Sequence, residues 1–158
     1  MIWKKPHISK IYEALTAIGD RRIEIDENDP NKAKCFSSSK GKFYDVIYDP
    51  GSNLINSNDN SAYHTETLSY PMIAFLMTKG FVSYSKSLLE PLKGIYWKEI
   101  NQKNKNDYSK AIEYVLDDLN KKGIDTNFIE KEVEKIYSEV SKLKIGRLGN
   151  KITPPEGW

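Results

Sequence analysis

Apolar positions recur with a helical period at both ends of the chain. Near the start, apolar residues are spaced three, four and three residues apart: Ile8, Ile11, Leu15 and Ile18. This spacing places them on one face of a helix, and Gly19 supplies a stop signal. The pattern therefore predicts a first helix over residues 9–18.

Two longer helices are predicted toward the other end. The first covers residues 107–121, and the second covers residues 127–144, where Asn127 and Glu130 have the spacing of a capping pair. The second helix carries a seam spaced four, three, four and three residues apart: Ile129, Val133, Ile136, Val140 and Leu143. Because only "KKGID" connects them, the two helices predict an αα-hairpin over residues 107–144.

Between residues 21 and 58 the pattern changes to the alternation typical of strands. The segments with this pattern are "RRIEID", "AKCFSSS", "KFYDVIYD" and "LINS". Turn-forming residues separate them, and Gly41 allows the positive φ that a tight turn needs. In the third segment, Tyr44, Val46 and Tyr48 share one side of the strand. The region predicts an antiparallel meander of three to four strands.

The stretch "YPMIAFLMTKG" is apolar on nearly every side. Pro71 stands where the first turn of a helix tolerates proline, and Gly80 stands where a helix would end. A helix that is apolar all round is usually buried, so we expect it between the sheet and the C-terminal half. Residues 86–92 predict another short helix.

Together these elements predict an α+β fold in a single domain, residues 1–146. A small antiparallel meander of three to four strands packs on a buried helix, and a C-terminal αα-hairpin follows. The length of 158 residues is within the usual size of one domain. The last residues, "GRLGNKITPPEGW", have the composition of a flexible tail over residues 147–158, from which Trp158 could dock on a neighbour.

Composition narrows the class of protein. A hydrophobic fraction of 39% and a charged fraction of 29% are typical of a folded globular protein. No apolar run approaches the roughly 18 residues that a membrane-spanning helix needs. The start of the chain, "MIWKKPHISK", lacks the apolar region of a secretory signal, and the single Cys35 excludes an intramolecular disulfide. We therefore expect a cytoplasmic protein that binds no membrane.

The net charge argues against a broad basic face. Lys and Arg total 24 against 22 for Asp and Glu, which leaves +2. A protein that grips duplex DNA over a wide surface usually has a larger basic excess. Any nucleic-acid surface on this chain must therefore be a local patch.

The loop before the buried helix carries a further pattern. Residues 36–80 have the order β-hairpin, loop and helix, with Asn58 to Asn60 ending a strand and Tyr70 to Met72 opening the helix. This layout resembles the SWIM zinc finger, a ββα module that carries CxC at the first of these positions and CxH at the second. Tyr63 matches the aromatic residue that commonly follows the CxC pair.

The zinc ligands of that family are absent. Structural zinc requires thiolate or imidazole ligands, which the amide, hydroxyl and thioether groups at these positions do not replace. The resemblance therefore implies a module without zinc, and we expect no cofactor. Packing of Tyr63, Tyr70, Met72 and Phe75 would then fix the loop on the helix, while Asn58, Asp59 and Asn60 would satisfy backbone groups. The alternative interpretation is a small α+β domain with a common loop-to-helix turn.

No combination of residues points to catalysis. His64 lies in a polar loop without a second suitable ligand, and Cys35 lies beside Phe36 in a strand, where cysteine commonly behaves as a small apolar residue. The glycine patterns of the common phosphate-binding loops do not occur. We predict no catalytic residue, no metal ligand and a non-catalytic binding function.

Two segments combine basic and aromatic side chains, which suits contacts with nucleic acid. One is the turn between the second and third strands, with Lys40, Lys42, Phe43 and Tyr44. The other precedes the last two helices, with Trp97, Lys98, Lys103 and Lys105. SWIM modules are associated with DNA binding and with protein–protein contacts. The first hypothesis is therefore an accessory nucleic-acid-binding module in DNA processing or regulation, with a solvated surface as the alternative for each segment.

The second hypothesis is a protein–protein adaptor or a homodimer. Its contact residues would be Val133, Ile136 and Val140 of the seam on the last helix, or Trp158 in the tail. A regular apolar stripe pairs with a copy of itself as well as with a neighbouring helix. Salt separates the two hypotheses, because phosphate contacts weaken as salt rises whereas an apolar interface changes little.

Overall fold

A five-stranded sheet with the strand order β1-β2-β3-β4-β5 forms the centre of the protein. The computed structural model describes residues 1–38 and 41–156, so Lys40 and Trp158 lie outside the described residues. The strands are β1 (Ile23–Ile25), β2 (Lys32–Phe36), β3 (Phe43–Asp49), β4 (Leu54–Ser57) and β5 (Gly146–Arg147). Neighbouring strands from β1 to β4 pair antiparallel, which confirms the predicted meander.

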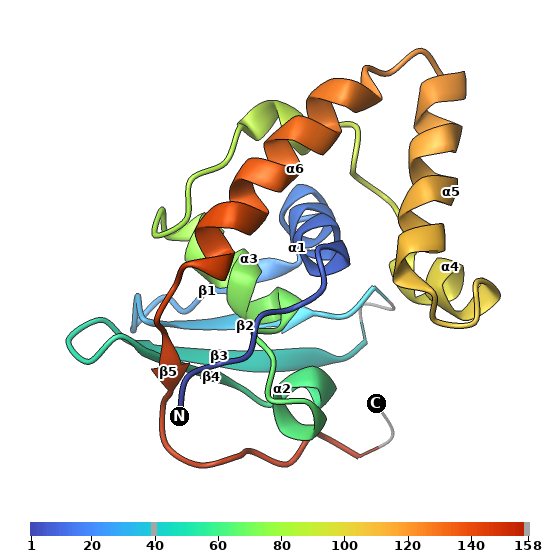
Figure 1. The fold of residues 1–158 in the computed structure, drawn as a ribbon. Helices are drawn as coiled ribbons and strands as arrows, with labels where there is room; N and C mark the ends of the chain where they lie inside the picture. Colours follow the sequence, from blue (N-terminus) through green and yellow to red (C-terminus); the bar gives the residue numbers. More distant parts are fainter. Residues whose placement is uncertain (39–40, 157–158) are drawn as a thin grey trace.

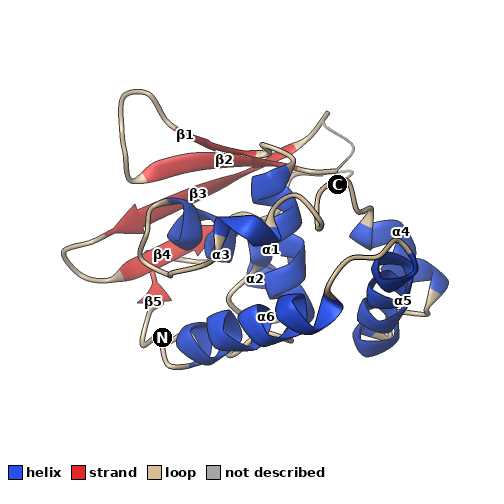
Figure 2. Ribbon diagram, turned by 90° about the horizontal axis from the view of Figure 1, so that it is seen from above, coloured by secondary structure: helices blue, strands red, loops and turns tan. Residues whose placement is uncertain are grey.

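Most of the helices lie on one face of this sheet, as Figures 1 and 2 show. They are α1 (Ser9–Gly19), α2 (Asn60–His64), α3 (Tyr70–Thr78), α4 (Trp97–Lys103), α5 (Tyr108–Lys121) and α6 (Thr126–Ser141), with a 3₁₀ turn, η1, at Lys86–Leu88. Helix α3 contacts both the sheet and α1, and α6 packs on α1 and α5. The fold is α+β, as predicted. No helix in the described part of the chain is long and apolar enough to cross a membrane.

The sheet is buried on the helical face and more exposed on the other. Ala33 and Cys35 of β2 are buried, while Lys32 and Lys34 between them are exposed. The cross-strand neighbours follow the same alternation, because Ala33 pairs with the buried Val46 and Lys34 pairs with the exposed Asp45. A strand that is apolar on one side and polar on the other thus fixes its own register.

Helix α3 is the buried helix that the sequence predicts. Every residue from Pro71 to Met77 is buried, and Phe75 is the largest of the fully buried side chains. Pro71 stands in the first turn, where its missing N–H group has no partner to lose. Gly80 follows the helix with a φ of 80°, a conformation that favours glycine.

Helix α6 corrects two predictions. Its seam, formed by Ile129, Val133, Ile136 and Val140, is at most 3% exposed and belongs to the protein's own core. The prediction that Val133, Ile136 and Val140 contact a partner is therefore wrong, because these side chains are already covered. The helix also begins earlier than predicted, since the carboxylate of Asp125 accepts the N–H of Phe128 at 3.1 Å and acts as the cap in place of Asn127.

The start of the predicted tail is attached to the sheet. Strand β5 pairs in parallel with β4, so that Gly146 and Arg147 lie beside Leu54 and Ile55. A Cβ atom on Gly146 would lie 2.8 Å from the carbonyl oxygen of Met1, so the close approach of these segments needs glycine. Beyond β5, the side chain of Asn56 donates to the carbonyl oxygens of Leu148 and Asn150. The boundary between domain and tail therefore lies beyond residue 147.

Candidate nucleic-acid interface

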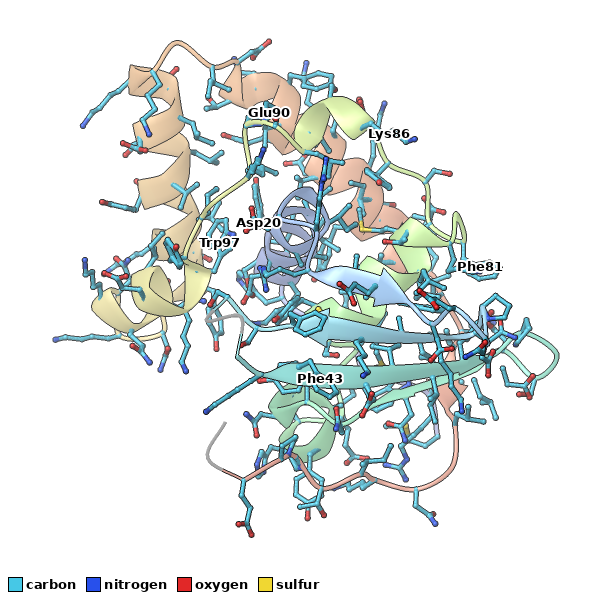
Figure 3. The ribbon with its side chains drawn as sticks, turned by 180° about the vertical axis from the view of Figure 1, so that it is seen from behind. Asp20, Phe43, Phe81, Lys86, Glu90 and Trp97 are labelled. Atoms are coloured by element: carbon cyan, nitrogen blue, oxygen red, sulfur yellow. The ribbon has the colours of Figure 1, made fainter. Side chains whose placement is uncertain are left out.

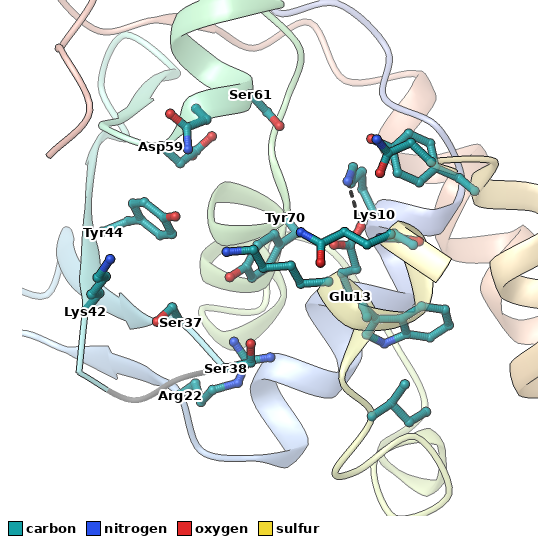
Figure 4. A pocket seen from close by; sticks show the side chains of 18 residues that line it. Lys10, Glu13, Arg22, Ser37, Ser38, Lys42, Tyr44, Asp59, Ser61 and Tyr70 are labelled. Carbon is teal, nitrogen blue, oxygen red and sulfur yellow. Dashed lines mark ion pairs between the residues drawn. The ribbon is translucent and has the colours of Figure 1, made fainter. Parts of the chain in front are cut away.

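A cleft of about 470 Å³ lies between the β2–β3 end of the sheet and helix α4 (Figure 4). Its walls come from segments far apart in the sequence. They include Lys10 and Glu13 of α1, Arg22 before β1, Lys42 and Tyr44 at the start of β3, Asp59 before α2, Tyr70 of α3, and Lys98 and Asn101 of α4. Both segments that the sequence singled out for nucleic acid therefore contribute residues to one site.

Trp97 anchors α4 to the rest of the fold. Its indole N–H donates to the hydroxyl of Thr16 at 2.9 Å, and that hydroxyl donates to the carbonyl oxygen of Leu92 at 2.7 Å. Figure 3 shows Trp97 between α4 and α1, and only 4% of the residue is exposed. The prediction that Trp97 stacks on a nucleic-acid base is wrong, because the ring is covered by the protein itself.

The other predicted residues of this segment lie on different sides of α4. Lys98 lines the cleft, as does Asn101, which is one turn beyond Trp97. Lys103 does not line the cleft and pairs with Glu99 at 3.1 Å on the exposed surface. Lys105 follows the helix with a φ of 53° and also lies outside the cleft. Of the four predicted residues in this segment, Lys98 alone combines exposure with a place in the cleft.

The predicted residues at the start of β3 also lie on two different sides, because successive side chains of a strand point to opposite faces of the sheet. Lys42 and Tyr44 line the cleft. Phe43 lies on the opposite face of the sheet (Figure 3), where its ring contacts Phe36 at 5.7 Å and the Nζ atom of Lys34 at 4.5 Å. Phe43 and Tyr44 therefore do not contribute to one surface.

Arg22 places a buried positive charge beside the cleft. The residue is only 6% exposed, and one of its terminal nitrogens donates to the carbonyl oxygen of Phe36 at 2.9 Å. Its Nε atom is buried without a hydrogen bond, and the Asp20 carboxylate lies 3.7 Å away. A charge in this position favours an anion in the cleft.

The phenol groups in the cleft stay protonated near neutral pH, and so does the buried thiol of Cys35, which does not line the cleft. Burial raises the pKa of Tyr44, and burial likewise raises the pKa of Tyr70. Burial raises the pKa of Cys35 from 9.0 to about 12. The phenols are therefore hydrogen-bond donors rather than anions, and the Cys35 thiol is not a nucleophile. The predicted burial of Cys35 is confirmed.

Acidic groups at the cleft are used within the fold. Glu13 pairs with Lys10 at 2.8 Å. Asp59 caps α2 through the N–H of Ala62 at 2.9 Å and accepts the Ser69 hydroxyl at 2.5 Å, which joins the start of α2 to the residue before α3. Asn58 accepts the backbone N–H of Asp45 at 2.8 Å. These side chains satisfy local polar groups, as expected, and the described residues contain no cluster of His, Cys, Asp and Glu suited to a metal ion.

A second cavity of about 510 Å³ continues the cleft past Arg22, Ser38 and Ile95, which line both. We call the two cavities together the basic groove. Among the described residues that line it, the basic ones are Lys10, Arg21, Arg22, Lys42, Lys93 and Lys98, and the acidic ones are Glu13, Asp20 and Asp59. Asp20 accepts the N–H of Gly94 at 2.8 Å, so each of these acids has a partner in the fold. The basic groove is thus a local concentration of positive charge on a chain whose net charge is only +2.

Comparison with known proteins places the chain in a family. The chain belongs to the family described as uncharacterised conserved protein UCP014422, whose model matches residues 3–146. No curated protein and no solved structure matches the chain. The matched range contains every residue of the basic groove, from Lys10 to Tyr108.

Proposed function

We propose that the protein binds single-stranded nucleic acid along the basic groove, as an accessory module without catalysis of its own. The observation that carries this proposal is the convergence of six basic residues, against three acidic ones, on one groove in a chain whose net charge is +2. Proteins that bind single strands combine such a groove with aromatic side chains on which bases stack. The SWIM resemblance implies a contact role of the same kind.

Phosphate contacts would come from both walls. Lys42 reaches the groove from the sheet and Lys98 from α4, while Arg21 and Lys93 line its far end. A strand of unpaired nucleotides suits a recessed groove of this kind, whereas a duplex suits a broad convex basic face. Each phosphate neutralised on a single strand contributes a slope of about −0.7 to the logarithmic dependence of affinity on salt.

Aromatic side chains line the same path. Tyr44 and Tyr70 point into the groove (Figure 4), Tyr108 also lines the first cavity, and Tyr96 lines the second. Tyr96 is 62% exposed, so its ring is open to a ligand. Stacking of one base on an aromatic side chain is worth about 1–3 kcal/mol. The exposure of Tyr96 makes it a better stacking residue than its buried neighbour Trp97.

Binding to labelled single strands and to duplexes of the same sequence, over a salt series, tests the proposal. We expect the wild type to prefer the single strand and to weaken steeply as salt rises. The double variant Lys42→Glu, Lys98→Glu should lose about ten-fold or more in affinity, and its salt slope should fall by about 1.4. The matched control is Lys131→Glu, Lys142→Glu, which makes the same charge change at exposed positions outside the groove.

Three results would count against the proposal. They are the absence of binding at low salt, binding that does not respond to salt, and an equal loss of affinity in the groove variant and the control. The seam on α6 does not support the adaptor hypothesis, because its side chains are buried within the protein. Docking through Trp158 and a cytoplasmic location stay predictions.

A further inference from the structure

The inner wall of the cleft contains a side-chain amide that the fold leaves unused. Asn101 of α4 is 6% exposed, and its Oδ1 atom is buried without a hydrogen-bond partner among the described residues. Its backbone carbonyl oxygen does have a partner, the N–H of Asn106 at 2.7 Å. The residue also lines the cleft. The group without a hydrogen bond is therefore the side-chain oxygen of a residue that lines the cleft.

Folding alone does not explain this asparagine. An unpaired acceptor in the interior is unfavourable, because it loses its hydrogen bonds to water and gains none in the protein. Leucine has a similar size and would avoid the penalty. Elsewhere in the described structure, buried amides are used, as in Asn56, which donates to the carbonyl oxygens of Leu148 and Asn150. A ligand in the cleft would supply the donor that Asn101 lacks.

Arg22 gives an independent indication of the same ligand. Its buried Nε atom has no hydrogen-bond partner among the described residues, although the Asp20 carboxylate lies 3.7 Å away, and Arg22 lines the same cleft. The cleft thus combines an acceptor without a hydrogen bond on Asn101 with a cationic donor, Arg22, whose Nε atom also lacks one. A ligand that satisfies both must carry an N–H donor together with an anionic or carbonyl acceptor. The cleft volume of about 470 Å³ is within the range of small-ligand pockets.

A nucleotide with an amino-bearing base meets both requirements. We propose that the cleft recognises one unpaired nucleotide whose base carries, on its base-pairing edge, an exocyclic amino group beside an unprotonated ring nitrogen, namely adenine or cytosine. The amino group donates to Oδ1 of Asn101, the ring nitrogen accepts from the Asn101 amide, and the phosphate lies toward Arg22. Asparagine makes this paired contact with adenine in many complexes. Uracil and thymine present the reverse pattern, a carbonyl group and a ring N–H.

This inference rests on the proposed function when the nucleotide is part of a strand, and a free mononucleotide would offer the same chemistry. The test compares oligo(A), oligo(C) and oligo(U) of equal length, together with AMP and UMP, at one low salt concentration. We expect oligo(A) and oligo(C) to bind about ten-fold more tightly than oligo(U). The variant Asn101→Leu should lose this preference, so that the three oligonucleotides bind with similar affinity.

Two further measurements separate recognition from a structural role. The melting temperature of Asn101→Leu should be equal to or above that of the wild type, because the unpaired acceptor has been removed. The control Asn104→Ala changes an amide on the same segment that bonds to the carbonyl oxygen of Ile100 and does not line the cleft. This control should keep the preference for oligo(A) and oligo(C).

The outcomes distinguish the two proposals. Equal binding of all three oligonucleotides by the wild type, or an unchanged preference in Asn101→Leu, overturns the recognition pocket while salt-sensitive binding in the groove still stands. Binding of AMP in preference to UMP, without binding of any oligonucleotide, supports the pocket and overturns the single-strand function. The absence of binding to every one of these probes overturns both.

Discussion

The interior beneath α6 and the cleft beside α4 both contain buried side chains from helices. The two regions differ in whether these side chains find partners within the protein. Beneath α6, Val133 and Ile136 belong to an apolar seam that needs nothing beyond the protein's own core. Beside α4, Trp97 finds a partner for its N–H in Thr16, while Asn101 one turn later finds none. The first region is explained by folding, and the second contains a polar group for which the described residues supply no partner.

This contrast identifies the site more clearly than charge does. Basic residues occur on many exposed positions of the chain, and exposed charges alone contribute little. Buried polar groups, by contrast, are nearly always paired in folded proteins. The coincidence of Asn101 and Arg22 in one cleft is therefore informative, because the Oδ1 atom of the first and the Nε atom of the second both lack a hydrogen bond among the described residues.

The seam beneath α6 should give the largest effect on stability. Ile136→Ala should lower the free energy of unfolding by about 2–5 kcal/mol, because it leaves a cavity in the core. Urea denaturation measures the loss, and Lys135→Ala at a neighbouring exposed position should change it by less than about 0.5 kcal/mol. If Ile136→Ala were nearly neutral, or if unfolding of the wild type depended on protein concentration, the seam would be a contact between copies after all.

A substitution in the cleft should change the free energy of unfolding in the opposite direction. Asn101→Leu should raise the free energy of unfolding by about 1–3 kcal/mol, because it removes a buried acceptor without a partner. Thermal and urea denaturation of the free protein measure this change. A clear loss of stability in Asn101→Leu would mean that the amide supports the fold, and the contrast between the two regions would disappear.

A substitution at Trp97 tests whether the role of this residue is structural. Trp97→Phe keeps an aromatic ring but loses the hydrogen bond to Thr16, so the free energy of unfolding should fall by about 0.5–1.5 kcal/mol. Affinity for a single strand should stay the same. A loss of affinity without a loss of stability would instead return Trp97 to the contact surface.

The smallest effect concerns pH. Because the pKa of Cys35 rises from 9.0 to about 12 on folding, the unfolded chain releases this proton first as pH increases. Stability from this group is complete below about pH 9 and falls toward pH 12, with a loss of less than about 1 kcal/mol at pH 9.5. Urea denaturation from pH 7 to 9.5 should show this decline, and Cys35→Ala should make it shallower. An equal decline in both proteins would remove Cys35 as its cause.

The sequence predicted the elements that local patterns define. Helix α3 could be placed from Pro71 and Gly80, and the meander from the alternation around Val46. The two-residue strand β5 could not be predicted, because it exists only through its pairing with Leu54 and Ile55. Helices α2 and α4 are short, and α4 is held by the distant contact of Trp97 with Thr16. Such elements depend on tertiary contacts more than on local propensity.

The site, like the fold, was predictable only where a local sequence pattern marked its residues. Lys42, Tyr44 and Lys98 were identified because basic and aromatic residues lie together in the sequence. Phe43 and Lys103 shared that pattern but face elsewhere, since a strand alternates its faces and a helix distributes its residues around its axis. Asn101 gave no signal, because its importance lies in a missing partner, which is a property of the folded structure.

Mapping the bound strand onto the protein by NMR tests whether single-stranded nucleic acid binds in the basic groove. A short oligonucleotide added to isotope-labelled protein at low salt should shift the backbone amide resonances of Arg22, Lys42, Tyr44 and residues 98–102. If the basic groove is the binding site, these shifts should saturate together and disappear as salt rises. Shifts confined to the outer face of the sheet at Lys32, Lys34 and Asp45, with the groove unchanged, would contradict it.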